Sequence, residues 1–328
     1  MAATTIDPSA AEGSARISRS AMFALAASTA AAGLAGFNAV RARRATRAHP
    51  PLGEFVTVEG VRLHYVARGA GPTVVLLHGN GVMIEDWLAS GVFDALTATN
   101  RVIAFDRPGF GHSERPRTTV WTPSAQARLI AEALKMLGED EVTVVGHSFG
   151  TLVALALAAE HRAQVSSLVL IAGYFYPSAR ADVLLAAPPA VPVVGDVLRY
   201  TASPLLGAAL RPGMEKQMFA PAPVSRGWRT EFPFEMSLRP SQIRAAAADA
   251  ALMIPAAAAL AERLPGLRLP VTIIAGTGDK IVDHQAQSSR LAGDIAGSEL
   301  LLIGDAGHMV HHAAPARIAG AITARAAA

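Results

Sequence analysis

The sequence predicts an α/β protein in which helices cover both faces of a mostly parallel, eight-stranded sheet. The first observation is a series of short β-branched runs that alternate with stretches of helical periodicity, as in parallel sheets. The second is an interval, residues 173–266, where this alternation stops, prolines recur and helical stretches emerge only late. The third is a hairpin pattern ahead of the first parallel strand. Together they predict a core sheet with one mainly helical insertion.

The strands are expected in a regular order. Two alternating runs, 55–58 and 61–66, flank Glu59-Gly60 and predict an antiparallel hairpin. Helical periodicity in segments such as 124–137 and 149–161 predicts the covering helices. The parallel strands are expected at 73–77, 101–105, 142–146, 166–171, 271–275 and 299–303.

Length and composition fit one large core with additions. The chain has 328 residues, of which 51% are hydrophobic, so it can bury a sizeable core. We divide it into an N-terminal extension at 1–50, a core at 51–172 and 267–328, and the insertion at 173–266. Cysteine is absent from the sequence, which excludes a thiol nucleophile, thiolate metal ligands and disulfides.

The net charge of +3 is unevenly distributed. Six arginines before Pro51 oppose Asp7 and Glu12, a balance of +4 that leaves the remainder of the chain at −1. The basic character therefore belongs to the extension, and the body is nearly neutral. We expect no nucleic-acid partner, because such a partner needs a basic surface on the folded body.

The segment around Ser148 predicts a nucleophile. An apolar strand at 142–146 ends in Gly-His-Ser-Phe-Gly, and helix-forming residues follow directly. A strand that turns sharply into a helix holds the intervening residue in a cramped backbone conformation, and side chains at Gly146 and Gly150 would collide there. The helix N-terminus also directs free N–H groups toward the serine. The alternative is an ordinary serine in a strand-to-helix turn, so an acid and a base are needed to decide.

A carboxylate and an imidazole follow at suitable places. Asp279 lies in a glycine-rich loop after the strand at 271–275, and His308 lies in the loop after the strand at 299–303. Because the carboxyl ends of parallel strands share one edge, both side chains are expected beside Ser148. His308 would accept the serine proton, and Asp279 would orient the imidazole.

Other candidates have simpler interpretations. Asp283 falls where a helix begins and is expected to be its N-cap. His311 and His312 suggest a metal site, but no carboxylate or cysteine stands at ligand spacing around them, so we expect a solvated helix start and no metal. Ser113 lies in an elbow-like Gly-His-Ser-Glu-Arg, where arginine replaces the second small residue, and is expected to be inert.

The order serine, aspartate, histidine, with a His-Gly motif upstream, resembles the α/β-hydrolase fold from about Pro51 to the end of the chain. Residues 74–81, Val-Val-Leu-Leu-His-Gly-Asn-Gly, resemble the strand and loop that supply half of its oxyanion hole. Residues 106–113 resemble the structural turn after its next strand. The resemblance implies a cap at 173–266. It also implies oxyanion donors at the backbone N–H groups of Asn80 and Phe149, and no cofactor.

The resemblance and the three site residues favour a serine hydrolase of carboxylic esters or related acyl compounds, acting on small, largely apolar molecules. Individually, the bulky residues of the cap are better explained by packing, but as a group they suggest an apolar pocket over Ser148. Carbon–carbon bond hydrolases and cofactor-free haloperoxidases or perhydrolases share the serine triad and stay open. Dehalogenases and epoxide hydrolases place aspartate at the elbow, so Ser148 argues against both. The non-enzymatic alternative is a ligand receptor.

The N-terminal extension contains an alanine-dominated apolar stretch. No residue from Ala21 to Val40 is charged, and a bilayer-spanning helix needs roughly 20 residues. Four arginines follow the stretch and two precede it, which places its C-terminal side in the cytoplasm. We expect a membrane anchor with a cytoplasmic catalytic domain. The alternatives are a cleaved signal peptide, favoured by small residues near Ala35, and a detached amphipathic or disordered extension.

Overall fold

The computed structural model contains the predicted eight-stranded sheet, with the strand order β1-β2-β4-β3-β5-β6-β7-β8. It describes residues 18–327; residues 1–17 and 328, and with them Asp7, Glu12 and Arg16 of the extension, lie outside the described part. β2 pairs antiparallel with β1 and β4, and the other neighbours pair parallel. The strands are β1 (Glu54–Val58), β2 (Val61–Arg68), β3 (Thr73–Leu77), β4 (Arg101–Phe105), β5 (Val142–His147), β6 (Val165–Ile171), β7 (Val271–Gly276) and β8 (Glu299–Ile303).

Helices cover both faces of the sheet, as predicted. Along β3, Val75 and Leu77 pack into a cluster with α4 and α5, whereas Val74 and Leu76 pack into a second cluster with α2, α3 and α14. Strands buried on both faces need continuous apolar runs, which explains the unbroken β-branched segments of the sequence. The helices outside the insertion are α1 (Arg19–Ala48), α2 (Ile84–Ser90), α3 (Val92–Leu96), α4 (Pro123–Met136), α5 (Gly150–Glu160), α12 (Arg290–Asp294), α13 (Val310–Ala313) and α14 (Pro315–Ala326).

The predicted insertion between β6 and β7 is helical. Its aromatic residues are largely buried: Tyr174, Phe175 and Tyr176 join the core, and Phe219 and Trp228 lie in a third apolar cluster. Packing therefore accounts for these side chains. The helices of the insertion are α6 (Ala181–Ala186), α7 (Val194–Tyr200), α8 (Ala202–Phe219), α9 (Arg226–Glu231), α10 (Phe234–Ser237) and α11 (Pro240–Ala261).

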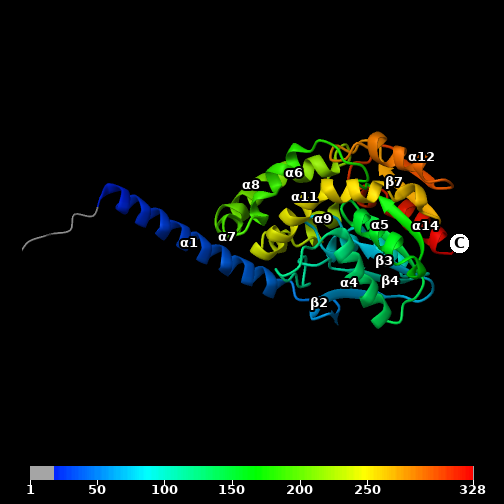
Figure 1. Cartoon of the computed structure of the whole chain (residues 1–328), viewed down its shortest axis with the longest axis horizontal. Coiled ribbons are helices and arrows are strands. Elements are labelled where there is room, and N and C mark those ends of the chain that lie inside the picture. Colours follow the sequence, from blue (N-terminus) through cyan, green and yellow to red (C-terminus); the bar gives the residue numbers. More distant parts are fainter. Residues whose placement is uncertain (1–17, 328) are drawn as a thin grey trace, which may run out of the picture.

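Helix α1 is one continuous helix of 30 residues that projects from the body at its N-terminal end (Figure 1). Its C-terminal part contacts α7 and α10. There the Asn38 side-chain amide donates to the carbonyls of Tyr200 and Thr201, both at 2.9 Å, and Ala45 is buried. The extension is thus attached to the insertion from about Asn38 onward.

Two helices of the described part are long and apolar enough to cross a membrane, α1 and α11. The apolar window of α11 is 39% buried inside the protein, as in a core helix, whereas that of α1 is not buried at all. A signal sequence near an N-terminus has the same properties as α1, so length and composition alone leave anchor and signal peptide as alternatives.

Candidate active site

The turn between β5 and α5 forces Ser148 into an unusual backbone conformation. Its φ is 51°, in the left-handed region that side chains rarely adopt. A Cβ atom on Gly146 would lie 2.6 Å from the Gly150 carbonyl oxygen, and one on Gly150 would lie 2.3 Å from the Leu77 carbonyl oxygen. Both contacts are too short for any side chain, so this sharp turn requires both glycines.

Ser148, His308 and Asp279 form one hydrogen-bonded chain. His308 Nε2 lies 2.9 Å from Ser148 Oγ, and His308 Nδ1 lies 2.8 Å from Asp279 Oδ2. The imidazole is buried, with 4% of its residue surface exposed, and Ser148 is half-buried. The carboxyl ends of β5, β7 and β8 thus bring together three residues that are far apart in the sequence.

The surroundings of Asp279 keep its carboxylate ionised. Burial alone would raise its pKa, but the nearby His308 and the hydrogen bonds to the carboxylate lower the pKa below its usual value. Two of these bonds come from the backbone N–H groups of Ile281 and Val282, at 2.7 and 3.0 Å to Oδ1. An anionic acceptor at Nδ1 selects the tautomer that carries its proton there. Nε2 is then free to accept the proton of Ser148.

The loop after β3 lies directly against the elbow. A Cβ atom on Gly79 would lie 3.2 Å from the Ser148 Cβ atom. His78 fixes this loop, since its Nε2 accepts from the Arg107 N–H at 2.9 Å and its Nδ1 lies 2.7 Å from the Gly79 carbonyl oxygen. Burial and the neighbouring Arg107 lower the pKa of His78 to about 4, so the ring is neutral. These contacts give His78 a structural role in holding the loop.

Phe149 follows Ser148 in the chain, and Asn80 follows Gly79 in the loop that lies against the elbow. Phe149 is the N-cap residue of α5, so its N–H group lies among the unpaired donors of that helix end. The Asn80 side chain donates to the carbonyl of Ala246 in α11 at 3.0 Å. Their assignment as oxyanion donors stays a prediction.

Sequence reasoning missed a buried ion pair that joins the insertion to this loop. Arg107 is fully buried and pairs with Asp249 of α11 at 2.6 Å, and Arg115 pairs with the same carboxylate at 2.8 Å. Arg107 also donates to the carbonyls of His78 and Gly79, at 2.8 and 2.9 Å. The turn at 106–113 was recognised only as structural, and nothing in the local sequence indicated a partner 142 residues away.

His311 and His312 lie at the start of a helix, α13, as predicted, but the expectation that they are solvated is wrong. Both imidazoles are buried, and their Nε2 atoms lie 3.1 and 2.9 Å from Asp86 Oδ1. Spacing could not show this carboxylate, which belongs to α2. Burial alone would raise the pKa of Asp86, but the two histidines hold it well below its usual range.

These three residues are also the group most able to hold a metal ion among the described residues, since one ligand atom from each lies within 4.8 Å of the others. The prediction that the two histidines have no carboxylate partner is therefore wrong, because Asp86 contacts both of them. As they stand, the Nε2–H groups of both imidazoles donate to Asp86 Oδ1, whereas Asp86 Oδ2 and His311 Nδ1 are buried without a hydrogen-bond partner.

Two other candidates have the simpler roles predicted for them. Asp283 Oδ1 accepts from the N–H groups of Gln285 and Ala286, at 2.9 and 3.3 Å, as a capping side chain does, although the N-cap position of this helix falls one residue later, at His284. Ser113 is buried, and its hydroxyl donates to the Asp106 carbonyl at 2.6 Å and accepts from the His64 N–H at 2.9 Å. Its hydroxyl is thus engaged in holding the turn.

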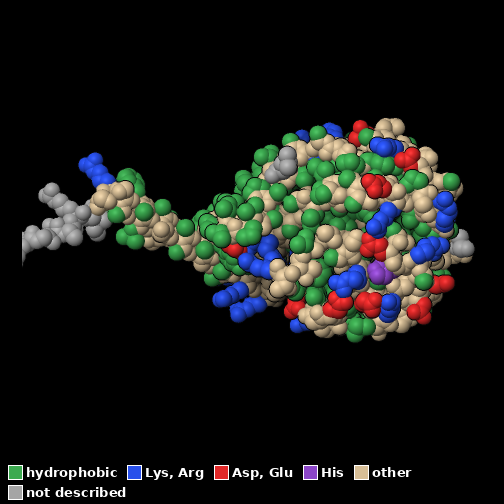
Figure 2. Space-filling view, viewed as in Figure 1, with side chains coloured by type: hydrophobic (Ala, Val, Ile, Leu, Met, Phe, Trp, Pro, Cys, Tyr) green, Lys and Arg blue, Asp and Glu red, His purple; other side chains and the backbone are tan. Residues whose placement is uncertain are grey.

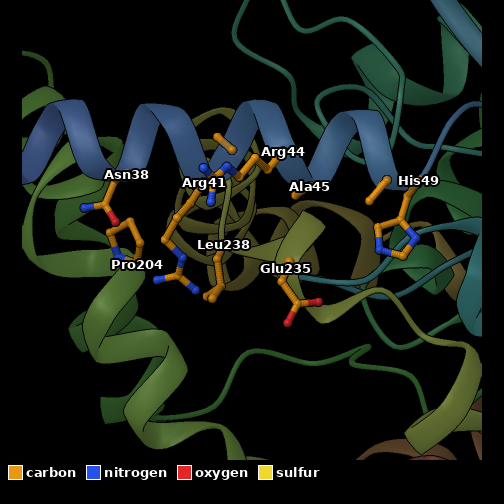
Figure 3. Close-up of a pocket in the computed structure, with 10 residues that line it drawn as sticks. Asn38, Arg41, Arg44, Ala45, His49, Pro204, Glu235 and Leu238 are labelled. Carbon is orange, nitrogen blue, oxygen red and sulfur yellow. The ribbon is translucent and has the colours of Figure 1, made fainter.

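Two cavities lie away from the elbow. One of about 340 Å³ is lined by α1 and the insertion, with Asn38, Arg41 and Glu235 among its residues (Figure 3). The other, of about 430 Å³, lies between the 109–116 loop and the start of α11. Ser148 lines neither cavity, so an apolar pocket over it stays a prediction.

The strand order of the sheet and the elbow between β5 and α5 are features of the α/β-hydrolase fold. Comparison with known proteins shows the same fold. Residues 72–315 match the family described as alpha/beta hydrolase fold, and the chain belongs to that family. The chain is 30% identical over 279 residues to haloalkane dehalogenase 2 of Mycobacterium tuberculosis, covering 80% of this chain and 91% of that protein. It is 34% identical over 136 residues to 2-hydroxymuconate semialdehyde hydrolase of Pseudomonas sp., covering 40% and 48%. A solved esterase from Thermogutta terrifontis has a similar fold, with a TM-score of 0.67, 24% identity and 83% and 97% of the two chains covered.

Proposed function

We propose that this protein is a serine hydrolase that cleaves carboxylic ester or related acyl bonds of small, largely apolar substrates. One observation carries the proposal: the hydrogen-bonded chain from Asp279 through His308 ends on the hydroxyl of Ser148, which the elbow holds half-exposed. A hydroxyl is a weak nucleophile at neutral pH unless a base accepts its proton during attack. The distances, together with the tautomer that the Asp279 carboxylate favours, supply such a base.

The proposed reaction has two halves. Ser148 Oγ attacks the carbonyl carbon while its proton passes to His308 Nε2, and the backbone N–H groups of Asn80 and Phe149 donate to the oxyanion. His308 then returns the proton to the leaving alkoxide, which leaves an acyl-enzyme. Water attacks the acyl group with His308 again as the base, and the acid is released. Asp279 stays ionised throughout and stabilises the imidazolium.

The chemistry of the elbow separates this proposal from the activity of the dehalogenase relative. The names of the relatives include a dehalogenase, a semialdehyde hydrolase and an esterase, so names alone do not decide the bond that is cleaved. An elbow with aspartate, as in dehalogenases and epoxide hydrolases, presents a carboxylate nucleophile, whereas this chain presents the hydroxyl of Ser148. The hydroxyl favours acyl transfer.

We further propose that residues 173–266 form a cap over the site and that α1 anchors the enzyme in a membrane with the catalytic domain in the cytoplasm. The contact of Asn80 with α11 and the Arg107–Asp249 pair support the first proposal, because they join the insertion to the loop beside Ser148. The unburied apolar window of α1 and the arginines that follow it support the second.

A fluorophosphonate probe tests the nucleophile. We expect the probe to label the wild type and the Ser298→Ala control, and to leave the Ser148→Ala and His308→Ala variants unlabelled. Ser298 is a matched control because its hydroxyl donates only to a backbone carbonyl at 3.2 Å, in the turn before β8. Full labelling of Ser148→Ala refutes the assignment. A panel of p-nitrophenyl esters then defines the preferred length of the acyl chain. If no ester is hydrolysed, turnover of a carbon–carbon bond substrate favours a carbon–carbon bond hydrolase, and turnover of peroxide favours a haloperoxidase or perhydrolase.

A further inference from the structure

The insertion exposes a concentration of apolar side chains on α7 and α8. On a soluble protein, a contiguous apolar surface of this kind marks an interaction site, whereas single exposed residues need no explanation. Figure 2 shows hydrophobic side chains gathered on the end of the body from which α1 projects. We call the following residues, between 51% and 73% exposed, the α7–α8 patch: Val193, Val194, Val197, Leu206, Leu210 and Met214.

Helix α1 leaves the body beside this patch. Asn38 donates to the carbonyls of Tyr200 and Thr201, at the junction between α7 and α8. Further along, Ala45 is buried, and His112 Nε2 lies 3.0 Å from the carbonyl oxygen of His49. The helix is therefore fixed to the body at two levels, so the direction in which it projects also fixes the orientation of the patch.

The lengths and charges match a membrane boundary at this point. From Arg19 to Phe37 the helix is about 28 Å long at 1.5 Å per residue, close to the roughly 30 Å hydrocarbon core of a bilayer. Arginines follow within the next turns, and the side chains of Arg41 and Arg44 lie at the cavity between α1 and the insertion (Figure 3). Cations at this level suit the anionic headgroups of a cytoplasmic leaflet.

We propose that the α7–α8 patch docks into the interfacial layer of the same bilayer that α1 enters. This inference rests on the proposed anchoring by α1, and it adds a second contact that holds the insertion against the lipid. Apolar side chains beside a row of arginines are the pattern that binds the boundary between headgroups and acyl chains. The enzyme then faces lipid-dissolved substrates, because the insertion, which contacts Asn80 in the loop beside the elbow, is the part in contact with the membrane.

The absence of cysteine permits a clean test with single labels. Leu206→Cys places an environment-sensitive fluorophore in the patch, and Met136→Cys places it at the end of α4, where the native side chain is 62% exposed. Both full-length proteins are bound to vesicles of mixed zwitterionic and anionic phospholipid that carry a nitroxide quencher on the acyl chain. We expect strong quenching and a blue shift for the label at 206, and neither change for the label at 136.

A third protein, Leu206→Cys combined with Val194→Glu and Val197→Glu, should float with the vesicles through α1 but lose its quenching. The proposal is overturned if the label at 206 is unquenched while the protein floats, since the body would then hang free on α1. It is also overturned if both labels are quenched equally, or if the change at 206 appears without vesicles and grows with protein concentration, which indicates a second copy. Failure to float overturns the anchoring as well. None of these readouts depends on catalysis, so labelling of Ser148 is judged separately.

Discussion

Two groups of aspartate and histidine lie side by side at the carboxyl edge of the sheet, and they differ in what completes them. In the first, Asp279 and His308 end on the half-exposed hydroxyl of Ser148. In the second, His311 and His312 both point into Asp86 and are sealed from solvent. The ring of His147 lies between the groups, with centroids 5.1 Å from His308 and 4.4 Å from His311.

The comparison shows that what an aspartate–histidine group can do depends on its third partner and on its access to solvent. The imidazole of His308 has one nitrogen on a carboxylate and the other on a hydroxyl, so it can receive a proton. The imidazoles of His311 and His312 use their Nε2 atoms on one carboxylate oxygen, and His312 Nδ1 lies 2.9 Å from the hydroxyl of Ser225 in the turn before α9. We therefore expect the first group to govern activity and the second to govern stability.

The largest effect is expected for Asp279→Asn. The amide would donate to the imidazole and favour the wrong tautomer, which lowers kcat by about 10⁴ in hydrolases with this arrangement. Ester turnover and thermal unfolding should show lost activity and a nearly unchanged Tm. The matched control is Asp283→Asn, four residues along the chain, which should stay within about threefold of wild type because it touches only a helix N-terminus. Retention of more than a tenth of the activity by Asp279→Asn would contradict the first half of the comparison.

The opposite pattern is expected for Asp86→Ala. Two buried imidazoles lose their acceptor, which should cost about 3 kcal/mol of unfolding free energy. Chemical denaturation measures this loss, and activity per folded site, counted with the fluorophosphonate probe, should stay within about tenfold. Asp94→Ala removes an exposed carboxylate and should change stability by less than about 0.5 kcal/mol. Unchanged stability with lost turnover would mean that the two groups act as one.

Stability should fall on mild acidification, through the buried neutral histidines. Burial lowers the pKa of His78 from 6.5 to about 4, and burial also lowers the pKa values of His147 and His311. Below pH 6.5 these histidines bind protons in the unfolded chain but stay neutral in the folded protein. The free energy of unfolding therefore declines by about 1.4 kcal/mol per pH unit for each such group. The contribution of His78 is complete above pH 6.5 and is lost by about pH 4.

Unfolding by denaturant at pH 7.5 and 5 checks this slope. Asp86 does not contribute in this window, because its lowered pKa adds stability that is lost only at more acidic pH. In His78→Asn, the number of protons taken up on unfolding should fall by about one, so the unfolding free energy should depend less steeply on pH. The oxygen of the new amide can still accept from the Arg107 N–H. A flat profile would mean that these imidazoles take up protons in the folded protein as readily as in the unfolded chain.

The smallest effect is expected for Ser225→Ala. Its hydroxyl caps α9 by accepting from the Trp228 N–H at 3.2 Å and also meets His312, so its loss should cost about 1 kcal/mol. Thermal unfolding measures this change, and kcat should be unaffected. Ser124→Ala, which removes a half-buried hydroxyl of α4 that donates to Glu160 Oε1 at 2.7 Å, is the control. A large loss of turnover in Ser225→Ala would instead show that the group formed by Asp86, His311 and His312 takes part in catalysis.

The local sequence was sufficient to predict a feature wherever the residues that the feature requires all lie within one short segment. The elbow could be predicted because the glycines on either side of Ser148 answer a steric demand within the segment itself. The placement of Asp279 and His308 followed from a rule of topology, that the loops after parallel strands meet at one edge. His311 and His312 were misjudged because their partner, Asp86, lies 225 residues away from His311, and spacing along the chain carries no information about it.

The sequence by itself determined the strands, the order in which they alternate with helices, the elbow and the apolar length of α1, because these depend on periodicity and on sterics within a few residues. Only the tertiary structure decided which imidazole meets which carboxylate, that Asp249 of the insertion neutralises the buried Arg107, and that Asn38 holds α1 to the α7–α8 junction. The physical reason is that a buried polar group must find a partner wherever the fold brings one, and distance along the chain does not constrain that choice.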